Sequence, residues 1–79
     1  MTKVIVRKLG KHGAVGLADS DTDTIEIDPR QKPKSYFDTI IHEALHIAFP
    51  GASETQVKKS TKTVRDILWG HGYRKVDVK

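Results

Sequence analysis

The sequence predicts an α+β fold, in which a small antiparallel sheet of about three strands packs on two helices. Three observations predict it. Short segments rich in β-branched residues lie within the first 28 residues, at positions 3–9, 14–18 and 24–28. Two longer segments with helical spacing of apolar residues follow, at positions 36–49 and 53–70. Short turns join the strands, and such turns connect antiparallel neighbours, because a parallel crossover needs roughly a dozen residues or more.

The turns between the expected strands are not predicted to bind a metal ion. His12 lies between two glycines in residues 10–13, and a lone histidine there is an exposed loop residue. Residues 19–23 (DSDTD) alternate carboxylates, but an EF-hand calcium loop requires glycine at its sixth position and glutamate at its twelfth. This chain has Thr24 and Arg30 at those positions. An acidic hairpin turn is therefore expected.

The first helix has start and stop signals in the sequence. Pro29 and Pro33 indicate a loop before it, because proline lacks an N–H donor and restricts the preceding residue. Ser35 is the expected N-cap, with Asp38 three residues later in a pair that resembles a capping box. The Pro-Gly pair at positions 50–51 ends the helix.

The second helix is expected to begin almost at once. Ser53 is its N-cap, and Gln56 completes a capping box. Trp69 closes the core at the other end, and Gly70 is the C-cap. Residues 73–79 alternate weakly, which leaves a short edge strand and a frayed tail as alternatives.

Length and composition limit the chemistry of the chain. Its 79 residues make one domain, residues 1–79, and a domain of this size often relies on a metal or a partner as well as its core. There is no cysteine, so neither a disulfide nor a thiolate ligand is available. A metal site must use histidine, glutamate or aspartate, a donor set that suits a catalytic zinc site with an open position.

The motif that determines the functional interpretation is H-E-A-L-H at positions 42–46. Four residues of α-helix turn by ~400° and rise ~6 Å, so His42 and His46 project from one face about a turn apart, and Glu43 lies ~100° from His42. Mostly apolar residues flank the motif, and buried polar groups need partners. The pattern is typical of two histidines that hold Zn²⁺ while the glutamate takes a proton from metal-bound water.

A third protein ligand is expected, because two histidines alone make a poor zinc site. Glu54 is one candidate, since the turn at positions 50–51 would fold the start of the second helix back towards His46. An acidic residue in the first turn of a helix also stabilises the helix dipole without a metal. His71, between two glycines after the second helix, is the alternative ligand. Asp66 is the last-ranked candidate for the third ligand, because it falls near the charged face of the second helix.

Two further roles at the predicted zinc site each have more than one candidate. A hydrogen-bond donor to the developing oxyanion is needed, and His71 and Tyr73 are the candidates for this catalytic role. His71 could equally interact with the helix C-terminus. The free nitrogen of His42 should have an orienting partner, either Asp38, four residues earlier, or a backbone carbonyl.

Residues 16–73 resemble the zincin metallopeptidases, and more closely the small phage-type, SprT-like or ImmA/IrrE-like metallopeptidase domains. The resemblance is carried by the strand at residues 24–28 (TIEID) and by the HEALH motif. It implies a minimal zincin-like fold and a zinc-dependent peptide-bond hydrolase with Glu43 as general base. It also favours Glu54 as the third ligand, although the spacing from His46 is shorter than in many such enzymes. Residues 24–28 are expected to form an edge strand that aligns an extended peptide or protein substrate.

The rival interpretation is a non-catalytic module that zinc stabilises and whose basic surface binds nucleic acid or a partner protein. The net charge is +4, which suits nucleic acid but also an ordinary solubilising surface. The apolar run at the N-terminus is too short for a signal peptide or a membrane span. We therefore expect a cytoplasmic location, the host cytoplasm if a phage encodes the protein, and no membrane partner.

Overall fold

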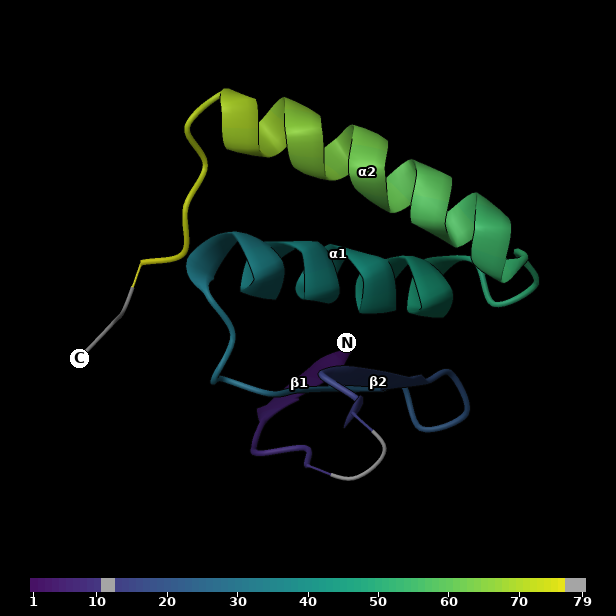
Figure 1. The fold of residues 1–79 in the computed structure, drawn as a ribbon. Helices are drawn as coiled ribbons and strands as arrows, with labels where there is room; N and C mark the ends of the chain where they lie inside the picture. The colour runs from purple at the N-terminus through teal and green to yellow at the C-terminus, as the bar shows by residue number, and fades with distance from the viewer. Residues whose placement is uncertain (11–12, 77–79) are drawn as a thin grey trace.

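The chain forms a three-stranded sheet and two helices (Figure 1). The structure is a computed structural model that describes residues 1–10 and 13–76; the turn residue His12 and the last residues of the expected tail, 77–79, lie outside the described residues. The elements are β1 (Lys3–Val6), β2 (Gly16–Asp19), β3 (Thr24–Ile27), α1 (Pro33–Ala48) and α2 (Glu54–Gly70). The predicted α+β class is confirmed.

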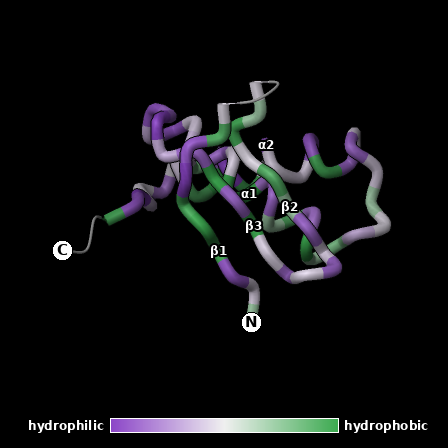
Figure 2. The backbone as a smooth tube through the Cα atoms, turned by 90° about the horizontal axis from the view of Figure 1, so that it is seen from below, coloured by the Kyte–Doolittle hydropathy of each residue, from purple (hydrophilic) through white to green (hydrophobic). Residues whose placement is uncertain are grey.

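The sheet is mixed rather than wholly antiparallel. Its order is β1-β3-β2, which Figure 2 shows from below. β2 and β3 form the expected antiparallel hairpin, whereas β1 pairs with β3 in parallel, with Lys3 opposite Thr24. The prediction was wrong for this pair because it considered only consecutive strands. Residues 7–23 connect β1 to β3 and include β2, so the connection is long enough for a parallel crossover.

Helix α1 lies between the sheet and α2, so the molecule has three layers (Figure 1). α1 contacts β2 and β3, and within the described residues α2 contacts α1 but no strand. Ile25 and Ile27 of β3 are buried under α1, and Val57 of α2 is buried on the other side of α1. No helix covers β1, where Val4 and Val6 remain about half exposed.

The start of α1 differs from the prediction. The helix begins at Pro33, and its N-cap is Lys32, which makes no side-chain capping bond. Proline suits the first helical position, because its fixed φ is helical and its missing N–H would have no partner there. Ser35 therefore lies inside the first turn and is not the cap; its carbonyl oxygen lies 2.9 Å from Thr39 Oγ1.

The start of α2 agrees with the prediction. Ser53 Oγ accepts a hydrogen bond from the backbone N–H of Gln56 at 3.1 Å. The helix ends at Gly70 with His71 as C-cap, one residue later than predicted, and residues 73–76 form neither helix nor strand. The Trp69 ring lies 5.7 Å from Phe37 of α1 between centroids. No helix in residues 1–10 and 13–76 is long and apolar enough to cross a membrane.

A buried carboxylate fixes the loop between β3 and α1. Asp28 accepts hydrogen bonds from the backbone N–H groups of Leu9, at 2.8 Å, and Arg30, at 2.9 Å. The Arg30 guanidinium donates to the same carboxylate at 2.7 Å. These hydrogen bonds, chiefly those from the Arg30 side chain, hold the pKa of Asp28 far below its ordinary range.

Candidate metal centre

His42, His46 and Glu54 meet at the end of the helix hairpin where α1 turns into α2. Glu54 Oε1 lies 2.8 Å from His42 Nε2, and Glu54 Oε2 lies 3.0 Å from His46 Nε2. The two Nε2 atoms are 3.2 Å apart. All three side chains thus offer a donor atom to one small volume and form a group that could hold a metal ion.

Local backbone structure explains why these residues meet. The two histidines share a face of α1 because they are four residues apart. A short turn follows, in which Ala52 N–H donates to the carbonyl of Phe49 at 3.0 Å. Since the Ser53 cap starts α2 immediately afterwards, Glu54 is its first residue and faces back towards the histidines. The structure therefore brings together the three residues that the sequence predicted as ligands.

The spacing of the donor atoms suits a tetrahedral metal ion. Ligand bonds of about 2.0–2.1 Å at tetrahedral angles place neighbouring donor atoms about 3.3 Å apart. The two Nε2 atoms are 3.2 Å apart, and the two Glu54 oxygens lie 2.8 Å from His42 and 3.0 Å from His46, respectively. One donor atom from each of the three residues lies within 4.8 Å of the others, so small side-chain shifts would bring the three donors to tetrahedral spacing. The Glu54 side chain is 55% exposed and free to make that adjustment. Two imidazoles and a carboxylate also leave one tetrahedral position open.

Glu43 lies beside this group on the side of α1 that faces the sheet. It is only 9% exposed and is one of four buried polar residues among those described. Burial raises the pKa of the Glu43 carboxyl above its ordinary value, His42 and His46 oppose the shift, and Glu54 adds to it. A carboxylate with a raised pKa holds a proton more readily than a solvated one, as a general base requires.

A hollow of about 310 Å³ opens between β2 and the metal group. Gly16, Leu17 and Ala18 of β2 line one side, and Glu43 and His46 of α1 line the other. β2 is an edge strand, whereas β3, expected at the edge from its residues 24–28, is the central strand. That expectation was wrong because the hairpin places the later strand between the other two.

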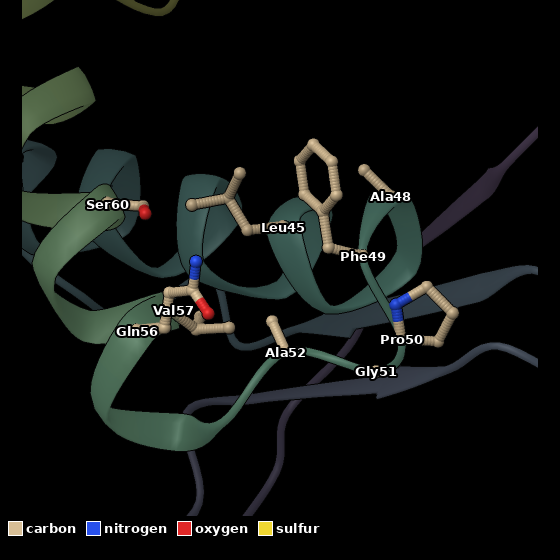
Figure 3. A pocket seen from close by; sticks show the side chains of 9 residues that line it. All are labelled: Leu45, Ala48, Phe49, Pro50, Gly51, Ala52, Gln56, Val57 and Ser60. Atoms are coloured by element: carbon tan, nitrogen blue, oxygen red, sulfur yellow. The ribbon is translucent and has the colours of Figure 1, made fainter.

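A second hollow of about 610 Å³ lies between the helices next to the turn. Figure 3 shows its lining by Leu45 of α1, by the C-cap residue Phe49, and by Gln56 and Val57 of α2. Pro50 lines both hollows, so the two adjoin at the end of α1. These lining residues were not predicted from the sequence, because their apolar spacing is indistinguishable from that of a core.

The other predicted site residues lie elsewhere. His71 caps the far end of α2 and stacks on Tyr73, with ring centroids 6.3 Å apart. A 17-residue helix is about 25 Å long, so this arrangement brings neither ring to Glu54, and neither can serve there as ligand or oxyanion donor. Asp38 accepts a hydrogen bond from Arg65 Nη1 at 2.6 Å and thereby joins α1 to α2. Arg65 also pairs with Asp66, the last-ranked candidate for the third ligand, at 2.9 Å between Nη2 and Oδ1.

Comparison with protein families, with curated proteins and with solved structures finds no match. The resemblance to the zincin metallopeptidases therefore stays a prediction, carried by the HEALH motif. The position of Glu54 beside both histidines is an observation independent of that motif.

Proposed function

We propose that the chain is a zinc-dependent peptide-bond hydrolase. One observation carries the proposal: the Glu54 carboxylate of α2 meets both Nε2 atoms of the motif histidines, at 2.8 and 3.0 Å. Two histidines and a carboxylate with an open fourth position are the ligand set of catalytic zinc. A buried glutamate, Glu43, lies on the neighbouring face of the same helix.

His42, His46 and Glu54 would hold the ion, and zinc supplies a water whose pKa is lowered to about 7. Glu43 would take one proton from a water at the open position as that water attacks the peptide carbonyl carbon. It would then give the proton to the leaving nitrogen as the C–N bond breaks, so that Glu43 would end each cycle ionised. In the metal-free protein burial raises the pKa of the Glu43 carboxyl, which favours proton uptake by this side chain.

The outer edge of β2, which pairs with no strand within the described residues, is the proposed binding site for the substrate. An extended peptide can add to an exposed sheet edge through main-chain hydrogen bonds. At β2 such a peptide would lie over the hollow between Gly16 and Glu43. The apolar hollow lined by Leu45, Phe49 and Val57 adjoins it. We therefore expect peptides with an apolar side chain next to the cleaved bond to be preferred.

The test is Glu43→Gln, measured against a library of short fluorogenic peptides with zinc added. Hydrolysis should disappear, while the zinc content and the circular dichroism spectrum match those of the parent. Glu26→Gln is the matched control, because Glu26 lies on the central strand and pairs with Arg7; it should retain activity. Hydrolysis that survives Glu43→Gln would refute the proposed general base.

A second candidate function, nucleic-acid binding, is favoured by a different surface. A hollow of about 730 Å³ near the C-terminal end of α2 is lined by four of the chain's five aromatic residues. Basic side chains accompany them: the Arg74 guanidinium lies 3.5 Å from the centre of the Trp69 ring, and Lys75 Nζ lies 5.6 Å from that of Tyr36. Aromatic rings with adjacent positive charge are typical of single-strand binding surfaces.

The only tryptophan of the chain, Trp69, lines this surface and reports on it directly. Quenching of its fluorescence by an oligothymidylate, with affinity that falls steeply with salt, would support nucleic-acid binding. Unchanged fluorescence at low salt would exclude this surface. The measurement does not depend on zinc, so it separates the two candidate functions.

A further inference from the structure

Gly16, the first residue of β2, has no room for a side chain. A Cβ atom at this position would lie 2.5 Å from Thr39 Cγ2, 2.9 Å from Glu43 Oε2 and 3.0 Å from Glu43 Cγ. These separations are at or below the shortest that Cβ atoms adopt. Gly10 and Gly51, in contrast, have no atom within 4 Å of such a Cβ. The close approach is therefore specific to the place where β2 crosses Glu43.

The backbone conformation does not explain this glycine. Positive φ angles among the described glycines occur at Gly13 and Gly72, not at Gly16. Gly16 pairs in register with Ile27 of the central strand, which is completely buried. β2 therefore has little freedom to move away from α1, and the missing side chain provides the space that the Glu43 side chain fills.

We infer that Gly16 is a positioning residue for Glu43, a role that rests on the proposed peptidase function. The space left by the absent Cβ allows β2 to press directly on the carboxylate and its Cγ atom. This contact limits the side-chain rotamers of Glu43 and holds the carboxylate beside His46 at the hollow. The specificity of the contact distinguishes Gly16 from a glycine that merely starts a strand.

Thr39 is the other neighbour, and it is held firmly. Its Oγ1 donates to Gln31 Oε1 at 2.7 Å and lies 2.9 Å from the Ser35 carbonyl. A methyl group added at Gly16 would therefore meet a fixed Thr39 and displace Glu43. Thr39→Ser removes the Cγ2 atom and keeps the hydroxyl, so it relieves the 2.5 Å contact and leaves both contacts with Glu43.

The experiment compares Gly16→Ala, alone and combined with Thr39→Ser, with the parent. Gly16→Ala should lower kcat by about 10²-fold, as expected for a displacement of about 1 Å, with KM and zinc affinity within a factor of two or so of the parent. The added Thr39→Ser should recover thermal stability but not kcat. Gly10→Ala, at a position with no atom within 4 Å of an added Cβ, and Thr39→Ser alone are the matched controls and should retain activity.

A second readout requires no activity. In the metal-free parent, nuclear Overhauser contacts should join the Gly16 Hα protons to the Glu43 Hγ protons. Absence of these contacts would overturn the inference, as would a Gly16→Ala protein or a double variant with parental kcat. If the parent hydrolyses no peptide, the peptidase proposal fails and this role fails with it. If the parent is active and Gly16→Ala is equally active, the positioning role alone fails.

Discussion

Zinc should stabilise the folded chain by a large fraction of its total stability. Proteins of 79 residues have unfolding free energies of about 4–12 kcal/mol. Only three apolar residues are fully buried among those described, Ile25, Ile27 and Val57, which suggests the lower part of that range. A ligand that binds only the folded state adds about 4 kcal/mol when its free concentration is about a thousand times its Kd.

This free energy converts to a measurable shift in melting temperature. For a domain of this size, 1 kcal/mol corresponds to about 4–8 °C, so saturating zinc should raise Tm by about 16–32 °C. The assay is a circular dichroism melt of protein treated with chelator, with and without added zinc. His42→Ala and Glu54→Gln should each remove most of the shift, because each removes one of three ligands.

Glu43→Gln is the matched control in this experiment. Its side chain is beside the ligand group but not part of it, so the zinc-dependent shift should remain. Zinc binding to this ligand group is refuted if the parent melts at the same temperature with and without zinc. It is refuted equally if the shift persists in a His42→Ala, His46→Ala double variant, since zinc would then bind elsewhere.

Three further experiments test the fold. Asp28→Asn should lower the free energy of unfolding at pH 7. Because the folded pKa of Asp28 is depressed, the carboxylate's contribution is present above about pH 4 and is lost on further acidification. Urea melts of the parent and the variant should therefore differ less at pH 3 than at pH 7. Ile27→Ala, at a residue with 0% exposure, should cost about 3–4 kcal/mol in chemical denaturation. Asp38→Asn and Arg65→Ala should show a coupling of about 1 kcal/mol in a double-mutant cycle, as a partly exposed ion pair allows.

The parts of the fold that follow from local sequence were predictable. The strand and helix segments depend on residue type and spacing within about ten residues, and the cap at Ser53 is a contact between residues three apart. The parallel pairing of β1 with β3 is not local, because residues 7–23 lie between the paired strands. Nothing in the three segments themselves selects which strand occupies the centre of the sheet.

The same distinction between local and non-local contacts applies to the site. His42 and His46 share a helix face whatever the tertiary structure, and Glu54 joins them because a short turn brings it back. His71 was a reasonable candidate by residue type, but the length of α2 separates it from Glu54 by about 25 Å. The contact of Gly16 with Glu43 joins a strand to a helix across 27 residues and has no local signature.

The position of the ligand group links function to stability. Among the helices and strands of the described residues, α2 contacts only α1, so contacts between the two helices fix its position against the rest of the fold. These contacts occur at three levels: Phe37 with Trp69 at one end, Asp38 with Arg65 further along, and both histidines with Glu54 at the turn. A metal at the turn would replace the close contacts of Glu54 with both histidines by coordination bonds and leave the other two levels unchanged. The residues that would hold the proposed catalytic ion are therefore also those that fix the first turn of α2.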